Sequence, residues 1–267
     1  MADALRLYVR YLGISARSQM QYRASFIMQT LGHFVVTGIE FLGVWALFAR
    51  FGSLRGWTLP EAAVLYGLVN IAFALADAFS RGFDLLAGMI RNGDFDRVLL
   101  RPRGTVLQIA AQELTLRRAG RLMQGAAVLV WGAWSCGVAW TPAKGALVLA
   151  AVAGGACFFS GLFILQGTLT FWTIESLEIA NILTYGGVET AQYPLTVYRP
   201  WFRLFFTFVV PLACVNYLPS QALLGRVGAG GAPAFVYWMA PAVGAVFLLV
   251  TVRVWHFGVR HYTSTGS

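Results

Sequence analysis

Charged residues are scarce in this chain. Only 12% of its 267 residues are charged and 58% are hydrophobic, whereas about 25% of the residues in soluble domains are charged. This scarcity excludes an ordinary soluble domain and indicates an integral membrane protein. Lysine is almost absent, since Lys144 stands alone beside 19 arginines. In a membrane protein, such a basic excess bears first on topology and not on nucleic-acid binding.

The sequence also lacks the patterns of metal sites and of common hydrolases. Its three cysteines, Cys136, Cys157 and Cys214, show no CxxC or Cys/His spacing, so neither a zinc site nor a disulfide framework is predicted. The patterns HExxH and GxSxG are both missing, and the three histidines are scattered. We therefore expect neither an enzyme nor a metal-binding protein.

No segment has the pattern of a phosphate-binding loop for ATP. The Walker A pattern ends in Gly-Lys followed by Ser or Thr, and the only lysine lies in the segment TPAKGA. The chain is therefore expected to hold no cofactor of its own. If ATP drives this protein, a partner chain must bind ATP and Mg²⁺.

Long apolar segments occupy most of the chain. A helix needs about 20 apolar residues to cross about 30 Å of hydrocarbon. Six segments qualify, near residues 24–49, 59–80, 119–140, 146–172, 202–222 and 234–256. The first begins too late and runs too long for a cleavable signal peptide. The expected fold class is an all-α integral membrane protein with six transmembrane helices, in which residues 1–267 form a single domain.

The distribution of basic residues predicts the topology. With six spans both termini lie on the same side, and 16 of the 20 basic residues lie on that side as well. The positive-inside rule makes it the cytoplasmic side. We therefore expect a multi-pass protein of the bacterial cytoplasmic membrane, with both termini and residues 81–104 in the cytoplasm. The remaining basic residues are Arg50, Arg55, Lys144 and Arg226.

The first 22 residues have the pattern of an amphipathic helix. Leu5, Tyr8 and Leu12 fall on one helical face, whereas Arg6 and Arg10 fall on another. Such a helix lies in the membrane interface, with its apolar side in lipid and its arginines near anionic headgroups. It either serves only as an anchor or also contacts a partner, and the sequence leaves both open.

A few polar side chains fall within or beside the predicted spans. Glu40 lies near the middle of the first span, where an ionisable group is a candidate for the translocation pathway. The alternative is a protonated or paired Glu that holds a helix interface. Asp77 precedes Arg81 by four residues, so an ion pair within one helix explains it. Gln166, in the fourth span, joins helices or lines the pathway, and polar residues of this kind more often join helices.

Two further segments have polar or helix-breaking character. Glu175, Glu178 and Glu189 are predicted to form an acidic patch at the cytoplasmic surface, paired with arginine-rich segments or with a partner. Pro211 and Pro219 interrupt the apolar run before the last span. Residues 211–232 are therefore expected to form a re-entrant element and a loop near the outer interface.

Residues 81–104, RGFDLLAGMIRNGDFDRVLLRPRG, predict two short helices joined by a turn. Apolar residues recur at helical spacing before and after Asn92 and Gly93, which supply the stop. Asp94 is expected to cap the second helix, and Pro102 ends it. Such short helices do not persist alone, so their apolar face needs a partner surface.

Four segments together resemble the permease subunits of ATP-binding-cassette type-2 (ABC-2) transporters. They are GFDLLAGMIRNGDFDRVLLRPRG, FWTIESLEIANILTYGGVETAQYPL, TFVVPLACVNYLPSQALLG and FGVRHYTSTGS. The resemblance covers essentially the whole chain. It implies an interfacial helix over residues 3–22, a coupling helix over 83–100 and a re-entrant element over 211–224.

The resemblance also implies partners and a mechanism. The chain would form half of the membrane pathway of an exporter, as a homodimer or heterodimer of permeases bound to two ATPase subunits. The apolar stripe of the coupling helix would pack into a groove of the ATPase. The predicted contact residues are Phe83, Asp84, Leu86, Ile90, Arg91, Asp94, Asp96 and Arg97.

Two interpretations of function remain open from the sequence. The first is the ATP-driven exporter, whose substrate would be a hydrophobic or amphipathic compound, a drug or a lipid. The second is an ATP-independent transporter or a membrane scaffold, with Glu40 as a proton-linked group. The second leaves the amphipathic 81–104 segment without a role, which favours the first.

Overall fold

The computed structural model describes most of the chain. The described ranges are residues 13–14, 17–19, 21–113, 118–173, 177–228 and 233–263. The interfacial helix expected over residues 1–22 falls largely outside them, as do Glu175 and the side chain of Glu178. Within these ranges the chain forms helices joined by turns and no strand, so the all-α class is confirmed.

Five helices of at least 17 residues form a bundle. They are α2 (Arg23–Phe51), α3 (Leu59–Ser80), α7 (Ala119–Ser135), α8 (Pro142–Leu169) and α13 (Ala242–Arg260). Among the described residues, four helices are long and apolar enough to cross a membrane. A fifth candidate is a bent pair of segments, Pro200–Val209 and Ala213–Leu223. The predicted count of six is therefore not reached by length and composition alone.

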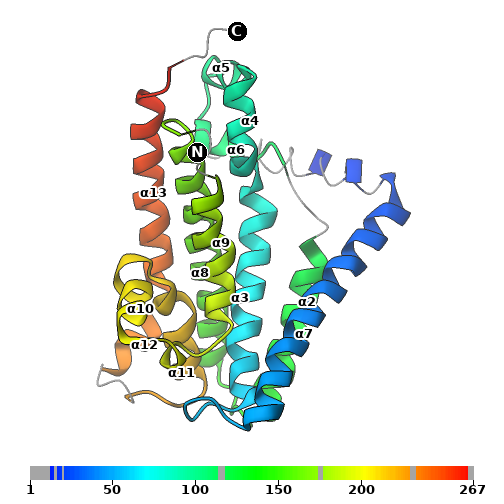
Figure 1. The fold of residues 1–267 in the computed structure, drawn as a ribbon, viewed down its shortest axis with the longest axis vertical. Helices are drawn as coiled ribbons and strands as arrows, with labels where there is room; N and C mark the ends of the chain where they lie inside the picture. Colours follow the sequence, from blue (N-terminus) through cyan, green and yellow to red (C-terminus); the bar gives the residue numbers. More distant parts are fainter. Residues whose placement is uncertain are drawn as a thin grey trace.

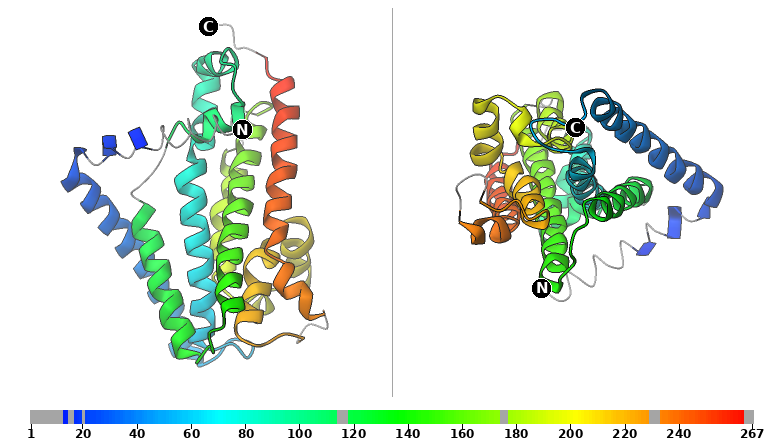
Figure 2. Two further views of the ribbon diagram at one scale, coloured as in Figure 1. Left: turned by 180° about the vertical axis from the view of Figure 1, so that it is seen from behind. Right: turned by 90° about the horizontal axis from the view of Figure 1, so that it is seen from below.

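Helix α3 occupies the centre of the bundle. In the helix that begins at Leu59, 78% of the residues in its apolar 18-residue stretch are buried. In the corresponding stretch of α2, only 17% are buried. Helices α2 and α7 lie on one side of α3, and α8, α9 (Leu177–Ala191) and α13 lie on the other (Figures 1 and 2). The exposed apolar surface of α2 is the surface expected to face lipid or another helix.

Local sequence explains where the central helices begin. At Thr58 a capping box forms, because the Glu61 carboxylate accepts hydrogen bonds from the Thr58 backbone N–H at 2.8 Å and from its hydroxyl at 3.0 Å. Thr141 caps α8 by accepting from the Lys144 backbone N–H at 3.2 Å. Proline follows both caps within the first turn, where its missing N–H costs nothing.

Glycine permits a close contact between α8 and α13. Gly154 of α8 meets Gly244 of α13, and a Cβ added at Gly244 would lie 1.9 Å from the Gly154 carbonyl oxygen. A Cβ added at Gly154 would lie 2.2 Å from the Pro241 carbonyl oxygen. Small residues of this kind let helix backbones approach in membranes. The pair therefore fixes α13 against α8.

The segment expected as a span over residues 202–222 is not one continuous helix, and it breaks at Pro211, one of the two prolines that were predicted to interrupt it. The chain there forms α10 (Pro200–Leu204) and the π-helix η4 (Phe205–Val209), then bends by 86° into η5 (Ala213–Tyr217) and α11 (Leu218–Leu223). Pro211 stands at the break, where it cannot donate a helical hydrogen bond. The bent segment lies at the end of the bundle opposite α5 (Asp94–Leu99), with α12 (Ala234–Met239) beside it (Figure 1).

Helix α9 runs lengthwise in the bundle where no span was predicted. It lies between α8 and the bent segment in sequence and packs on both α3 and α8 (Figure 1). Its 15 residues extend about 22 Å at 1.5 Å per residue. Arg199 and Arg203, which follow it, therefore lie at the end of the bundle opposite α5, and not on the side of residues 81–104.

Candidate functional site

Residues 81–104 extend the central helix beyond the bundle. The 3₁₀ helix η1 (Arg81–Leu85) continues α3 and is followed by α4 (Leu86–Arg91) and α5 (Asp94–Leu99). Gly93 turns the chain at φ 73°, a value that glycine adopts without strain. Two short helices with a turn are thus confirmed. The capping prediction was wrong, because Gly93 is the N-cap and Asp94 pairs with Arg97 at 3.4 Å.

The apolar stripe of this segment is buried inside the chain itself. Phe83 is 1% exposed, Leu86 is fully buried and Ile90 is 4% exposed. All three belong to the main core cluster, together with residues of α8 and α13. The prediction that these side chains fill a groove of an ATPase was therefore wrong, because the permease core already covers them. Whether other residues of the segment bind an ATPase stays a prediction.

Five aromatic side chains fasten the segment to the bundle. We call them the aromatic anchor: Phe83, Phe95, Phe171, Trp255 and Tyr262. The ring centroid of Trp255 lies 5.1 Å from that of Phe83 and 5.2 Å from that of Phe171. The ring centroids of Phe95 and Tyr262 lie 4.9 Å apart. Such edge-to-face pairs each contribute about 0.5–1.5 kcal/mol beyond burial. The segment is thus tied to the ends of both α8 and α13.

Hydrogen bonds add to this attachment. The Trp255 indole N–H donates to the Thr105 hydroxyl of α6 (Thr105–Ala110) at 2.8 Å. The Gln166 amide of α8 donates to the Asp84 carboxylate at 3.2 Å and lies 3.4 Å from the Asn181 side-chain oxygen of α9. Gln166 is only 2% exposed. It therefore joins helices, as the more common role of such residues predicts.

The most exposed apolar side chain of the segment, Leu100, lies near its far end. Leu100 is 84% exposed and Leu99 is 40% exposed. Arg91, Arg97 and Arg101 are exposed around them. We call these five residues the loop tip. Figure 1 shows α4 and α5 at one end of the molecule, the same end at which α13 ends. A pair of exposed leucines among arginines is a surface that a partner protein can cover.

Asp77 is the most deeply buried charge of the bundle. Its carboxylate is fully buried and pairs with Arg81 at 3.3 Å, as the sequence predicted. It also pairs with Arg118, which stands at the start of α7 and is only 14% exposed. This second partner could not be predicted from local spacing, because 41 positions separate the two residues. Two arginines neutralise one buried carboxylate, as burial requires.

Glu40 has a specific partner as well. Its carboxylate lies 3.1 Å from the guanidinium of Arg121, which joins α2 to α7. The Arg121 side chain is 10% exposed and that of Glu40 is 38% exposed. This pairing agrees with the interpretation of Glu40 as a paired group at a helix interface. The pair joins two long helices near the middle of α2.

A polar cavity of about 240 Å³ lies beside this ion pair. Helix α2 lines it with His33 and Glu40, α7 with Arg121, and α9 with Tyr185 and Glu189. Glu189 lines this cavity with an exposed side chain. The prediction that it forms one acidic patch with Glu178 is wrong, because α9 carries Glu189 more than three helical turns from Leu177.

Replacing Glu40 tests its role in the helix interface. We expect Glu40→Ala to lower the melting temperature of the purified protein, because the nearly buried Arg121 loses a charge-assisted hydrogen bond of about 1.5–3 kcal/mol. Glu40→Gln keeps an oxygen that accepts from Arg121 and should lower the melting temperature less. Equal melting temperatures for Glu40→Ala and the wild type would contradict this role. A transport defect in a Glu40→Gln protein of normal stability would instead assign Glu40 to the pathway.

The arrangement of helices and polar groups defines a polytopic helical membrane protein. Among the described residues, no group of His, Cys, Asp or Glu could hold a metal ion. Comparison with known protein families gives one finding: residues 34–266 match the family described as ABC-2 family transporter protein. The chain belongs to this family, as its resemblance implied. No curated protein and no solved structure gives a match.

Proposed function

We propose that this chain is the permease subunit of an ATP-driven exporter and forms half of its membrane pathway. Its family supports a transporter role, and its sequence contains no Walker A pattern. A separate ATPase subunit would then supply the energy. The observation that carries the proposal is the loop tip, an exposed surface joined rigidly through the aromatic anchor to the transmembrane bundle.

The mechanism follows from how residues 81–104 are attached. A force applied at the loop tip acts on α3 directly, because η1 continues α3, and acts on α8 and α13 through Phe171 and Trp255. ATP-driven closure of two ATPase subunits would therefore shift these three helices together. A second permease, identical or related, would complete the pathway. The shift would alternate its access between the two sides of the membrane.

The ATP-independent alternative has less support. It required Glu40 to gain and lose a proton during transport. Glu40 instead lies 3.1 Å from Arg121, so its pairing between α2 and α7 accounts for it without a role in proton transfer. The ATP-independent alternative also assigns no function to the attachment of the loop tip to α8 and α13 through the aromatic anchor.

The exporter proposal is tested with purified proteins. We expect the ATPase encoded beside this gene to copurify with the chain when both are expressed. In vesicles, a transported amphiphile should stimulate ATP hydrolysis by the complex. An ATPase whose Walker A lysine is replaced should bind the chain but support no transport. If no ATPase binds, and transport continues without ATP, the proposal fails.

The proposed topology has six crossings, with α9 as the fifth and the bent segment returning to the outer side. Single cysteines at positions 94, 144 and 199 test it, in a protein whose native cysteines are replaced. We expect an impermeant thiol reagent to label positions 144 and 199 in intact cells, but to label position 94 only after lysis. If the reagent does not label position 199 in intact cells, residues 202–222 would cross the membrane as first expected. If it labels position 94 in intact cells, the six-crossing topology is refuted.

A further inference from the structure

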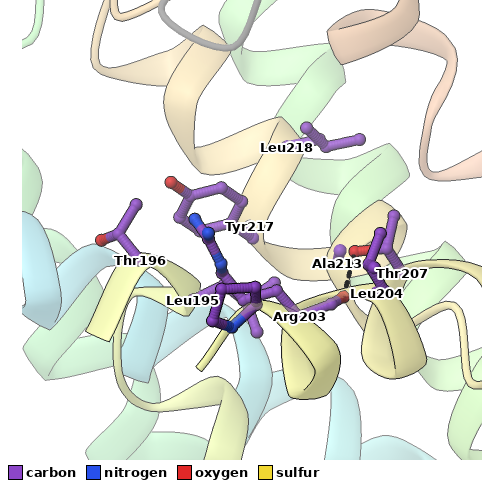
Figure 3. A pocket seen from close by; sticks show the side chains of 9 residues that line it. Leu195, Thr196, Arg203, Leu204, Thr207, Ala213, Tyr217 and Leu218 are labelled. Carbon is purple, nitrogen blue, oxygen red and sulfur yellow. Dashed lines mark hydrogen bonds between the residues drawn. The ribbon is translucent and has the colours of Figure 1, made fainter. Parts of the chain in front are cut away.

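The bent segment encloses a second cavity, of about 340 Å³. It lies at the end of the bundle opposite α5, between the turn η3 (Leu195–Val197), α10, η4, η5 and α11 (Figures 1 and 3). Leu195, Leu204, Ala213 and Leu218 supply much of an apolar lining. Neither the loop tip nor the ion pairs described above contribute a residue to the lining of this cavity.

Arg203 introduces a positive charge into the apolar lining. Within the part of the chain that the structure describes, no carboxylate lies within 4.0 Å of its guanidinium, and no Asp or Glu lines the cavity. Figure 3 shows the Arg203 side chain extending toward Tyr217. Arg226, at the same end, is by contrast paired with Glu61 at 2.5 Å. The Arg203 guanidinium is therefore available to bind an anion.

Tyr217 offers a second donor in the same cavity. Its hydroxyl oxygen accepts a hydrogen bond from the Gln221 amide at 3.0 Å and also lies within hydrogen-bonding reach of the Thr196 hydroxyl. A phenol oxygen can accept two hydrogen bonds and donate one, so when Thr196 donates to it Tyr217 can donate its own proton to a further acceptor. The Thr207 hydroxyl, by contrast, donates to the Arg203 carbonyl at 2.7 Å. A guanidinium and a phenol side by side suit a phosphate oxygen, because arginine binds phosphate through several N–H groups.

The surroundings of the cavity indicate where the anion comes from. Exposed apolar side chains surround it on the same segment: Trp201 is 64% exposed, Leu204 59%, and Phe208 78%. Trp is enriched at membrane–water interfaces, where its ring lies at the level of the headgroups. A free anion in water would gain nothing from these side chains. A membrane lipid would place its chains against them.

We propose that this cavity binds the headgroup of an anionic phospholipid from the surrounding bilayer. Arg203 and Tyr217 hold the phosphate, and the apolar lining covers the first part of an acyl chain. A volume of about 340 Å³ lies at the lower end of the range of ligand pockets, about 300–1,000 Å³, which suits a headgroup but not a whole lipid. Binding needs no ATPase, so it is tested independently of the exporter proposal.

Isothermal titration of the purified full chain in a neutral detergent tests this site. The ligands are dioctanoyl phosphatidylglycerol, the zwitterionic dioctanoyl phosphatidylcholine, and glycerol 1-phosphate, which has no chains. We expect phosphatidylglycerol to bind most tightly. Arg203→Gln should weaken its binding about tenfold or more, the effect of losing a charge-assisted hydrogen bond. Tyr217→Phe, which keeps the ring, should weaken it severalfold.

Arg199→Gln is the matched control. Arg199 is exposed one turn before Arg203 at the same end of the molecule, but it does not line the cavity. Its replacement removes the same charge and should leave binding unchanged. Equal losses in Arg199→Gln and Arg203→Gln would show only general attraction to a basic surface and overturn the site. Glycerol 1-phosphate binding as tightly as phosphatidylglycerol would make it a free-anion site, and equal binding of phosphatidylcholine would refute anion selectivity.

Discussion

Replacing both Leu99 and Leu100 with glutamate should abolish copurification of the ATPase. Leu100 is 84% exposed and Leu99 40% exposed at the loop tip, so a partner that covers them gains about 1.5–3 kcal/mol for each fully buried side chain. The variant loses this gain and would have to bury two charges as well. We expect a loss of affinity of at least about 100-fold. Insertion should stay normal, because the side chains lie at the surface.

Leu85→Glu is the control for this experiment. Leu85 is 45% exposed, but it lies in η1 at the start of the segment and not at the loop tip. Leu85→Glu introduces one of the same negative charges, against two in the double variant, and should retain the ATPase. Retained binding and normal ATP-driven transport in the Leu99→Glu, Leu100→Glu variant would refute the assignment of the loop tip as the coupling surface. Loss of binding in both variants would show that charge anywhere in the segment is disruptive.

Burial changes what is expected of the apolar stripe. Aspartate at Leu86 and Ile90 would place charges among Phe83 and Trp255 inside the main core cluster. Such a variant should be poorly folded, so its loss of ATPase binding would not identify the contact surface. The pattern of the sequence correctly indicated an apolar face that needs a partner surface. It could not indicate that the partner surface belongs to the same chain.

Local hydropathy predicted much of the bundle. The second span was expected over 59–80 and α3 is Leu59–Ser80; the first was expected over 24–49 and α2 is Arg23–Phe51. These predictions succeed because a long apolar run in lipid must satisfy its backbone hydrogen bonds within a helix. The turn at Gly93 was also predicted, since glycine is the usual residue for a positive φ.

The failures have physical causes beyond local sequence. Helix α9 has only 15 residues and includes Asn181, Thr184 and Glu189, so packing against α3 and α8 compensates for its modest length and polarity. In the bent segment Pro211 correctly indicated an interruption, but the 86° angle of the break depends on how its two halves pack. Arg118 and Asp77 form their pair across two helices. Neither composition nor periodicity contains such contacts.

Asp77→Ala should be the most destabilising single substitution in the bundle. It would leave Arg118, whose side chain is 14% exposed, without its buried partner and would remove one partner of Arg81. Breaking a buried pair from one side costs about 3–5 kcal/mol, because the remaining charge is uncompensated. We expect little of the variant to be recovered as a single peak in size-exclusion chromatography. Asp77→Asn, which keeps a hydrogen-bond acceptor, should be intermediate.

A double substitution separates charge imbalance from lost volume. If the uncompensated guanidinium causes the defect, Asp77→Ala combined with Arg118→Met should be recovered better than Asp77→Ala alone, because apolar replacement of a whole buried pair is often neutral. Arg81 would keep Glu113, whose carboxylate lies at 3.8 Å. A double-mutant cycle of Asp77→Ala, Arg118→Met and the double variant, followed by thermal unfolding, gives the coupling energy between the two residues. A double variant no more stable than Asp77→Ala, or a single variant as stable as the wild type, would show that this pair does not hold α7 against α3.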